Sequence, residues 1–412
     1  MTLYIKLQWQ SCLEVKLKKI VIIGQGYVGM PLALAASKSG IEVLGIDTNM
    51  VKINQINAAI SPIEDISDDE LKVILDSGNY KVSDKPHFDT TFEIICICVP
   101  TPLSKNHQPD LEMLAVAVRD VGKSLKPGML VIIESTIQPG TTRNIVIPIL
   151  EKESGLSRDQ FLVAYSPERV DPANKKWNIN NTPKLVSGLT EEAAQKAKEF
   201  YSKFINQVDI CDSLEVAETA KLLENSFRLV NISFINELAI FCQKIGINII
   251  DVVKAAESKP YGFMPFYPSV GVGGHCIPVD PIYLASAAKE AGAPTRFIDL
   301  ADQINLEMPR YFVGRADEIL GGLKGKKVLV IGVAYKPNVA DVRETPVAAL
   351  ITGLEKSGAS VAWHDDLVKT WNNQSSSPVT DQYDLAIIAT PHDYIQLSNL
   401  GNTPILNTRG SK

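Results

Sequence analysis

Short apolar runs alternate with helix-like segments in the first part of the chain. The runs are rich in valine and isoleucine, which is typical of strands buried on both faces of a sheet. Turn-forming residues such as glycine, proline, serine and threonine follow them. We therefore expect a parallel sheet covered by helices, with strands at residues 19–23, 41–46, 93–99, 130–133 and 161–165.

The apolar period becomes helical between Ser213 and Ile245, and Gly246 stands where a C-terminal cap is expected. One helix of this length is long compared with the domains that flank it. We expect it to join them and to offer a surface for a homodimer. Its apolar stripe consists of Val216, Ala220, Leu223, Phe227, Val230, Phe234, Leu238, Phe241 and Ile245.

The C-terminal part of the chain repeats the strand order of the N-terminal part. A repeat of this kind predicts a second parallel α/β domain. Three pairs of segments correspond: 19–24 with 327–332, 42–47 with 360–365, and 93–101 with 384–392.

A glycine-rich turn joins the first predicted strand to the helix-like residues 30–39. Gly24 permits a tight turn, Gly26 lets a pyrophosphate approach the backbone, and Gly29 lets helix and strand pack closely. The helix N-terminus also attracts an anion. Tyr27 and Val28 lie in the same turn, and all five residues are candidate contacts of a dinucleotide.

Asp47 ends the second predicted strand, 21 residues beyond Gly26. An acid at this position hydrogen-bonds the adenosine ribose and repels a 2′-phosphate. The combination predicts an NAD-binding domain of the Rossmann type and favours NAD over NADP. The fold that we expect is α/β, with two doubly wound Rossmann-like domains joined by the long central helix.

The corresponding turn in the second domain, Gly332 to Asn338, lacks the third glycine and gains a lysine. We expect it to hold a different anionic ligand, with Lys336 and Arg343 supplying positive charge.

Composition narrows the class of protein. The chain has 412 residues, of which 45% are hydrophobic and 21% charged, and its net charge is −6. The absence of long basic runs argues against partners such as nucleic acid or a membrane surface. Six irregularly spaced cysteines indicate a reducing compartment, so we expect a cytoplasmic protein. Residues 1–18 lack the order of a signal peptide and form an extension before the first strand.

Serine and threonine follow two of the predicted strands. Thr101 comes after the strand at 93–99, and Ser135 and Thr136 come after the strand at 130–133. Ligands bind at the carboxyl ends of strands in doubly wound sheets. These three residues are therefore candidate ligand contacts, although helix capping is an alternative explanation.

Two pairs of polar residues are further candidates for the functional site. Glu168 and Arg169 follow the strand at 161–165, where they could serve substrate or catalysis or form a solvated loop pair. Lys221 and Asn225 are four residues apart on the long helix, so their side chains are neighbours on one face. They could reach one reacting group or simply be solvated.

Cys276 is the strongest candidate for chemistry. It lies in the polar, glycine-rich loop from Gly271 to Asp280, which lacks an apolar period that would bury the sulfur. A structural thiol is the alternative. We interpret the other cysteines as small buried or peripheral residues with no chemical role. They are Cys12, Cys96, Cys98, Cys211 and Cys242. His275 has no partner at ligand spacing, so we expect no metal site.

A thiol beside a nicotinamide site suggests a particular reaction. It can capture an aldehyde as a thiohemiacetal, which oxidation converts to a thioester that water then cleaves. One site could thus convert an alcohol to an acid.

The chain resembles the UDP-glucose/GDP-mannose dehydrogenase superfamily over nearly its whole length. The motifs that carry the resemblance are Gly24 to Gly29, Ser166-Pro-Glu-Arg169, Lys221-Leu-Leu-Glu-Asn225, Gly273-Gly-His-Cys-Ile-Pro-Val-Asp280 and Ala334 to Glu344. Residues 165–172 and 259–268 resemble the branch that oxidises UDP-N-acetylglucosamine at C6, with the UDP-N-acetylmannosamine enzymes as close neighbours. Lys259-Pro260 stands where several glucose-specific members carry an arginine, and Ala173 stands where close relatives have glycine.

The resemblance implies a role for each matching position. Cys276 would be the nucleophile, and Lys221 and Asn225 would stabilise the oxyanion. Asp280 would hold a water or tune Lys221, and Glu168 would activate the hydrolytic water, with Thr136 positioning it. The implied substrate contacts are Glu168, Arg169, Lys221, Asn225, Tyr267, Ser269, Gly271, Gly273, Tyr335, Lys336, Arg343 and Arg409.

The expected domains are an extension at 1–18, an NAD-binding domain at 19–205, a central helical and dimerisation domain at 206–310, and a UDP-sugar-binding domain at 311–412. We expect oxidation of the C6 hydroxyl of a UDP-N-acetylhexosamine, preferably UDP-GlcNAc, to the uronic acid, with two NAD consumed. The alternatives are the same chemistry on UDP-ManNAc or UDP-glucose, a two-electron hydroxy-acid dehydrogenase, and a non-catalytic NAD-binding regulator.

Overall fold

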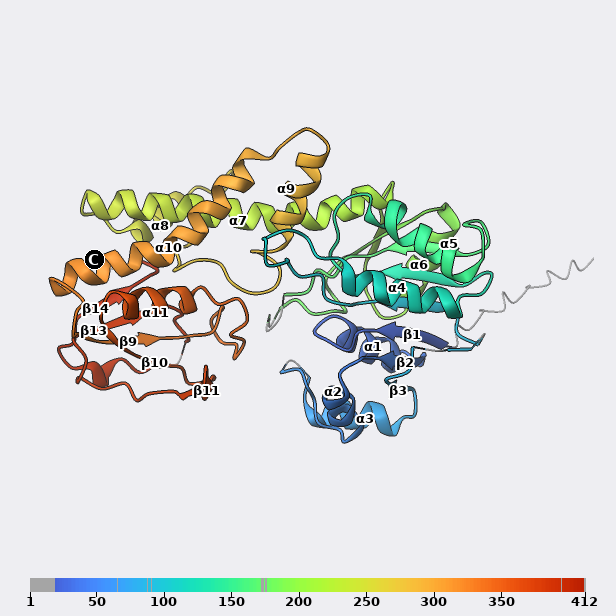
Figure 1. Cartoon of the computed structure of the whole chain (residues 1–412), viewed down its shortest axis with the longest axis horizontal. Helices are drawn as coiled ribbons and strands as arrows, with labels where there is room; N and C mark the ends of the chain where they lie inside the picture. Colours follow the sequence, from blue (N-terminus) through green and yellow to red (C-terminus); the bar gives the residue numbers. More distant parts are fainter. Residues whose placement is uncertain are drawn as a thin grey trace, which may run out of the picture.

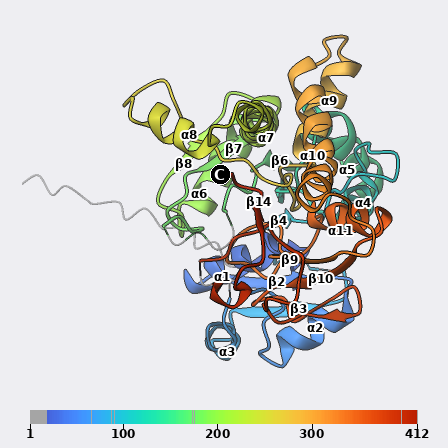
Figure 2. The same cartoon turned by 90° about the vertical axis from the view of Figure 1, so that its left-hand side faces the viewer.

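The computed structural model contains two parallel-stranded lobes that are bridged by the long helix α7 (Leu214–Lys244) (Figure 1). It describes residues 19–64, 66–86, 88–89, 91–171, 174, 176–393 and 395–410. Figure 2 looks along the long axis and shows α7 end-on, above the strands. The predicted extension at 1–18, Cys12 and Ala173 lie outside the described residues.

The N-terminal sheet has eight strands in the order β3-β2-β1-β4-β5-β6-β7-β8. The first six strands in the chain run parallel, and β7 pairs antiparallel with β6. This reversal brings the start of β7 to the edge where β5 and β6 end. The strands are β1 (Lys19–Ile23), β2 (Glu42–Ile46), β3 (Tyr80–Ser83), β4 (Ile94–Ile97), β5 (Leu130–Ile133), β6 (Leu162–Tyr165), β7 (Lys184–Gly188) and β8 (Val208–Ile210).

Helices cover both faces of this sheet, as predicted. Ile20 and Ile22 pack on one face with α1 (Gly29–Lys38), α3 (Asp68–Asp76) and α6 (Glu191–Tyr201). Val21 and Ile23 pack on the other face, where the helices are α4 (Glu112–Ser124), α5 (Ile147–Ser154), which a π-helix at Thr142–Val146 precedes, and the start of α7. The short helix α2 (Met50–Asn57) follows β2. Alternate strand residues thus fill two separate cores.

Three further helices pack around α7. They are α8 (Ile249–Glu257), α9 (Asp280–Glu290) and α10 (Arg296–Leu320). Gly246 has a φ of 78° directly after α7, as predicted for its cap, because this conformation costs a glycine little. Among the described residues no helix is long and apolar enough to cross a bilayer.

The apolar stripe of α7, which we expect to offer a homodimer surface, lies mostly on the outside of the single chain; Phe234 and Phe241, for example, are each 55% exposed. A different set of residues on α7 is buried against α9, α10 and the N-terminal sheet. The buried residues are Leu214, Ala217, Glu218, Lys221, Leu222, Ser226, Leu229, Ser233, Ile235, Asn236 and Cys242. Helix α7 therefore has a mixed apolar and polar face toward the protein and a separate apolar stripe that points outward.

The C-terminal sheet has four parallel strands in the order β10-β9-β13-β14. Helices α10 and α11 (Val347–Lys356) cover one face, and loops with a short 3₁₀ turn at Ser398–Leu400 cover the other. The strands are β9 (Lys327–Ile331), β10 (Ser360–His364), β13 (Leu385–Ile388) and β14 (Ile405–Asn407), beside the hairpin β11 (Thr370–Trp371) and β12 (Gln374–Ser375). The C-terminal domain is thus a smaller version of the N-terminal parallel α/β domain.

The predicted repeat is visible in matching hydrogen bonds. Gly24 N donates to Ile46 O at 2.7 Å, and Gly332 N donates to His364 O at 2.8 Å. Two elements run across the predicted domain boundaries. Strand β8 belongs to the first sheet and extends it to Ile210, beyond the predicted boundary at 205/206. Helix α10 continues through the predicted boundary at 310/311 and packs its second half on α11.

Candidate active site

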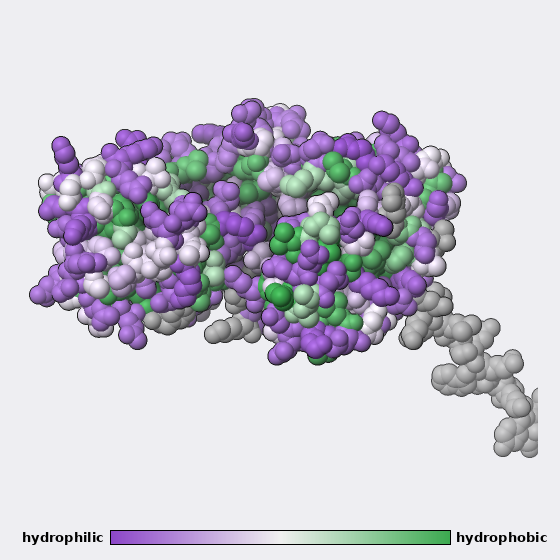
Figure 3. All heavy atoms as spheres, turned by 60° about the horizontal axis from the view of Figure 1, so that its bottom comes forward, coloured by the Kyte–Doolittle hydropathy of each residue, from purple (hydrophilic) through white to green (hydrophobic). Residues whose placement is uncertain are grey.

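The two lobes meet across a hollow beneath α7, which is visible from below in Figure 3. Contacts between described residues of the two lobes bridge it. Arg343 lies over the ring of Tyr27 at 4.3 Å, Lys336 Nζ lies 2.7 Å from Asp171 Oδ1, and Ala340 N donates to a carboxylate of the N-terminal lobe. Two predicted substrate contacts and one predicted NAD contact therefore face the same cleft.

The glycine turn after β1 has the shape that a dinucleotide needs. A side chain at Gly24 would lie 2.5 Å from Cys98 O, and one at Gly29 would lie 1.8 Å from Gly24 O. Gly26, in contrast, has open space where a side chain would be. No side chain caps the N-terminus of α1, so the turn is free to receive a pyrophosphate.

Asp47 lies beside this turn and is held from three sides. Its carboxylate accepts from Gln25 N at 2.8 Å, Asn49 N at 2.9 Å and Lys52 Nζ at 2.6 Å. Burial would raise the pKa of Asp47, but Lys52 and the backbone donors outweigh it and hold the pKa below the ordinary value. The Asp47 carboxylate is therefore ionised at neutral pH.

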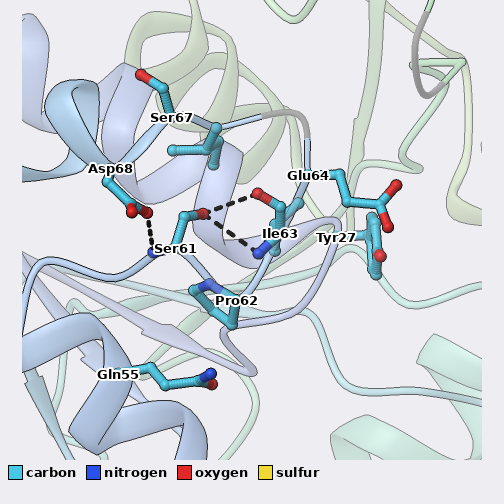
Figure 4. A pocket seen from close by; sticks show the side chains of 9 residues that line it. Tyr27, Gln55, Ser61, Pro62, Ile63, Glu64, Ser67 and Asp68 are labelled. Carbon is cyan, nitrogen blue, oxygen red and sulfur yellow. Dashed lines mark hydrogen bonds between the residues drawn. The ribbon is translucent and has the colours of Figure 1, made fainter. Parts of the chain in front are cut away.

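A shallow pocket adjoins the glycine turn on the cleft side (Figure 4). Residues 61–64 and 66–68 line one side of it, and the Ser61 hydroxyl hydrogen-bonds the backbone of Ile63. Tyr27 and Glu64 lie side by side at one end, and Glu64 is the acceptor for Ala340 N at 3.4 Å. Cys276 is not part of this pocket.

The strand-end hydroxyls tie β4 to β5. Thr101 Oγ1 donates to Thr136 O at 2.7 Å, and Ser135 Oγ donates to Val99 O at 2.7 Å. Both bonds fix the backbone at the edge where ligands bind, so Thr101 and Ser135 shape the cofactor edge through their backbone. Thr136 is half-buried at the same edge.

Cys276 and its predicted partners come together at the start of α9. The carbonyl of Cys276 accepts from Val279 N and Asp280 N in the turn that begins the helix. Asn225 Nδ2 donates to Asp280 Oδ2 at 2.6 Å, and Lys221 Nζ lies 3.9 Å from the same oxygen. Lys221 and Asp280 are buried, whereas Cys276 is exposed. Residue 276 is thus exposed in the single chain, and its thiol is surrounded by enough protein to interact with the charges of a buried polar cluster.

The electrostatics of this cluster are set by burial and by opposite charges. Surrounding protein removes much of the water and raises the pKa of Cys276 to about 11, although the Lys221 charge opposes the shift. Burial also raises the pKa of Asp280 to about 6. For Lys221 burial would lower the pKa, but Asp280 and the other nearby anions raise it above the ordinary value. Lys221 is therefore charged and Cys276 is a thiol at neutral pH.

Helix α9 fastens the thiol loop to the first sheet. The hydroxyl oxygen of the buried Tyr283 lies 3.1 to 3.3 Å from the carbonyl oxygens of Thr101, Pro102 and Asp110, and its single proton can donate to any one of them. These carbonyls belong to the segment that follows β4. The nucleophile candidate is therefore held against the carboxyl edge of the NAD-binding sheet.

Glu168 lies at the end of β6, and its Oε1 accepts from Arg169 N at 2.7 Å and Val170 N at 2.6 Å. Burial would raise the pKa of Glu168, but Lys184 and these backbone donors hold it below the ordinary value. The Arg169 side chain pairs with Glu224 at 2.6 Å. Sequence reasoning did not find Lys184, because a single lysine before an apolar strand gives no signal of its partners.

The loop between α8 and α9 carries the other predicted substrate contacts. Asn236 Oδ1 accepts from Ser269 N at 2.9 Å, and Asn305 Oδ1 accepts from Val272 N at 2.6 Å. A side chain at Gly273 would lie 2.5 Å from Glu344 O, so the loop presses against the C-terminal lobe. Gly271 has a φ of 137°, which favours glycine.

Three aromatic or basic residues complete this side of the cleft. Tyr335 packs against Gly274, and the charge of Arg343 acts on Cys276. Burial lowers the pKa of Arg409, and Tyr267 is one of its neighbours. Tyr335 and Arg343 therefore lie near the thiol loop, while the predicted contacts with substrate stay a prediction.

Three family models match the chain in order. They describe the NAD-binding domain of the UDP-glucose/GDP-mannose dehydrogenase family at residues 18–205, its central domain at 215–307 and its UDP-binding domain at 329–406. The chain belongs to the UDP-glucose/GDP-mannose dehydrogenase family. It is an NAD-dependent nucleotide-sugar dehydrogenase.

Individual members of the family show the same relationship. The chain is 35% identical over 380 residues to the UDP-N-acetyl-D-glucosamine 6-dehydrogenase of Pseudomonas aeruginosa, covering 90% of this chain and 87% of the relative. It is also 35% identical to the UDP-N-acetyl-D-mannosamine dehydrogenase of Pyrococcus horikoshii, covering 91% and 89%. A UDP-D-ManNAc dehydrogenase structure from Pyrococcus horikoshii superposes with a TM-score of 0.87 at 33% identity, covering 95% of both chains.

Proposed function

We propose that this dehydrogenase oxidises the C6 hydroxyl of UDP-N-acetylglucosamine to the carboxylate through a covalent intermediate on Cys276. The observation that carries the proposal is the exposed thiol beside the buried cluster of Lys221, Asn225 and Asp280. A simple alcohol dehydrogenase needs no nucleophilic side chain at this position, because its reaction forms no covalent intermediate. NAD held at Gly24, Gly26, Gly29 and Asp47 supplies the two-electron acceptor for each of the two oxidations.

In the first oxidation, the charged ammonium of Lys221 and the amide of Asn225 stabilise negative charge on the substrate oxygen. Asp280 has a pKa near 6, so it can exchange a proton with a nearby water close to neutral pH. The substrate alcohol becomes an aldehyde.

Cys276 then adds to the aldehyde carbon. Because the free residue is a thiol, its proton passes to the former carbonyl oxygen as the carbon–sulfur bond forms. The second oxidation converts this thiohemiacetal to a thioester. Water attacks the thioester carbon, Glu168 accepts the proton of that water, and cleavage of the carbon–sulfur bond releases the acid and restores the thiol.

The choice of sugar rests on two observations. Residues 165–172 and 259–268 resemble the UDP-N-acetylglucosamine branch, and a relative that covers most of the chain bears that activity in its name. UDP-N-acetylmannosamine is the second candidate, since another relative at the same identity carries that name. Lys259-Pro260 disfavours UDP-glucose.

We also propose a division of labour among the domains. Residues 19–205 bind NAD, residues 206–310 carry the thiol loop and the dimer contact, and residues 311–412 bind the UDP moiety. The exposed aromatic residues of α7 support a homodimer that packs through this helix.

The experiment compares UDP-GlcNAc, UDP-ManNAc and UDP-glucose with the purified protein and NAD. We expect two NADH and one uronic acid per sugar, with the highest kcat/KM for UDP-GlcNAc. Cys276→Ser should abolish formation of the acid. One NADH per substrate, with activity retained in Cys276→Ser, would instead support a two-electron dehydrogenase.

A further inference from the structure

A buried ion network lies behind Glu168. Lys184 Nζ is 2.7 Å from Glu134 Oε2 and 3.5 Å from Glu168 Oε2. Tyr201 OH donates to Glu134 Oε1 at 2.5 Å, and the Lys184 ammonium also lies 5.1 Å from the centre of the Tyr201 ring. The side chains of Lys184 and Glu134 are 5% and 0% exposed. Each polar group of this network has a partner within it.

Strand direction explains why these residues meet. Glu134 follows β5 and Glu168 follows β6, so both lie at the carboxyl edge of the sheet. Because β7 runs antiparallel to β6, its first residue, Lys184, reaches this same edge. A parallel seventh strand would place that lysine at the opposite edge.

A network of buried charges contributes little to the stability of a fold, which points to another role for this one. Buried ion pairs seldom stabilise a protein more than an apolar core of the same volume, because each charge loses its hydration. Here one of the two carboxylates faces the proposed thioester site. The second oxygen of Glu168 contacts Lys184, while its first oxygen takes the two backbone donors.

We propose that Lys184 is a positioning residue for thioester hydrolysis: anchored by Glu134 and Tyr201, it fixes the orientation of the Glu168 carboxylate and keeps it ionised. This inference rests on the proposed function. It adds that the base depends on a lysine that does not itself contact the substrate.

The groups facing Glu168 favour its ionised form on balance. Two ammonium groups and two backbone N–H groups act in that direction, against burial and one carboxylate, while the two nearby thiols are uncharged at neutral pH. The titratable groups that act on it are Lys184 from β7, Lys221 from α7, Glu134 after β5, Cys98 after β4 and Cys276 before α9. Lys184 is the strongest of the favourable partners.

The step concerned is the attack of water on the thioester. Oxygen bonds to the carbonyl carbon, one water proton passes to Glu168, and the carbon–sulfur bond breaks with the electron pair leaving on sulfur. The thiolate then regains a proton. An ionised, correctly oriented Glu168 is needed at the first of these events, so loss of Lys184 slows hydrolysis and leaves the earlier oxidations intact.

The test uses the full-length protein with UDP-GlcNAc, or whichever UDP-sugar it oxidises. In the double variant Glu134→Gln/Lys184→Met both buried charges are removed together, so neither remains unpaired. Thioester breakdown is followed by quenching and measuring the mass of the sugar adduct on Cys276. Loss of the Lys184 charge raises the pKa of Glu168, and loss of the Glu134 charge offsets part of that shift, so we expect the acid limb to move upward by about one unit. We expect breakdown at least about tenfold slower at pH 6, because the carboxylate also loses its fixed orientation.

The matched control is Lys184→Arg, which keeps the charge and should restore most of the hydrolysis rate. A double variant that folds and hydrolyses the adduct with the wild-type rate and pH profile overturns the proposal. If the wild-type protein oxidises no UDP-sugar, the proposed function fails separately. Crystal structures of wild type and double variant then decide the positioning role: an unmoved Glu168 carboxylate refutes it.

Discussion

The guanidinium of Arg343 lies 4.3 Å from the centre of the Tyr27 ring, so a residue of the C-terminal lobe contacts the glycine turn of the NAD-binding domain. Tyr27 belongs to the predicted cofactor site and Arg343 to the predicted substrate site. Their contact joins the two sites directly.

This contact predicts an effect of Tyr27 on substrate binding. Tyr27→Ala removes a cation–π contact worth about 0.5–1 kcal/mol, so KM for the UDP-sugar should rise about two- to fivefold. Tyr27→Phe keeps the ring and should leave that KM unchanged. Initial-rate kinetics with NAD saturating measure both values. A Tyr27→Ala variant in which only KM for NAD changes would refute the link.

The raised pKa of Asp280 predicts that the rate of the first oxidation falls at acidic pH. Its pKa is raised from 3.8 to about 6 by burial, so the rate of first NADH formation should fall as the pH falls through about 6. Asp280→Asn should lose this limb, with a rate at pH 8 reduced about 10- to 100-fold. Rapid-mixing measurements between pH 5 and 8 give both profiles. Persistence of the limb in the Asn variant would assign it elsewhere.

The same shift predicts a pH dependence of stability. Below about pH 4 both folded and unfolded states hold the Asp280 proton; between about 4 and 6 only the folded state does. The stabilisation from this group is therefore complete below pH 4 and is lost as the pH rises through 6. Chemical denaturation at several pH values should show a flatter profile for Asp280→Asn than for wild type.

The exposed face of α7 predicts a mutation that separates subunits. Phe234→Glu/Phe241→Glu places two charges where we expect an apolar dimer contact, so light scattering should find a monomer in place of a dimer. Phe297→Glu is the control, because Phe297 on α10 is 79% exposed but lies off the stripe. A dimer that persists in the double variant would move the interface elsewhere.

Gly273 predicts a steric defect in the substrate loop. A side chain there would lie 2.5 Å from Glu344 O and 2.8 Å from Pro346 Cδ, so Gly273→Ala should displace the loop. We expect KM for the UDP-sugar to rise at least about tenfold, the cost of roughly 1.4 kcal/mol of lost binding. Gly314→Ala in α10, where nothing lies within 4 Å, should leave KM unchanged and raise the melting temperature slightly. Equal effects of both substitutions on KM would contradict this explanation.

Periodicity and motif spacing predicted most of the fold. The strand runs and the repeat between residues 19–101 and 327–392 matched the two sheets, because buried parallel strands leave a strong apolar signal. The expectation that α7 offers a dimer surface came from the length of the helix and not from the periodicity of its stripe. An apolar face is equally periodic whether it meets a core or a second subunit.

The sequence predicted which residues belong to the site, but it did not predict the network of contacts between them. Cys276, Lys221, Asn225 and Asp280 came from motifs, whereas the position of Lys184 depends on the direction of β7. The repeat also hid a chemical difference. Both Asp47 and its counterpart Asp365 accept from the backbone N–H that follows the preceding glycine, but Asp47 pairs with Lys52 whereas Asp365 pairs with the buried His392 at 3.0 Å.

The Tyr283 hydroxyl has a consequence for turnover. It holds α9, and with it the thiol loop, against the carbonyls of Thr101 and Pro102 in the NAD-binding domain. The C-terminal lobe contacts that domain at Tyr27, Glu64 and Asp171, and it also packs against the thiol loop at Gly273 and Gly274. A movement of the C-terminal lobe that released the product nucleotide would therefore also relax the loop beside the reactive cysteine, which couples product release to the state of the thiol site.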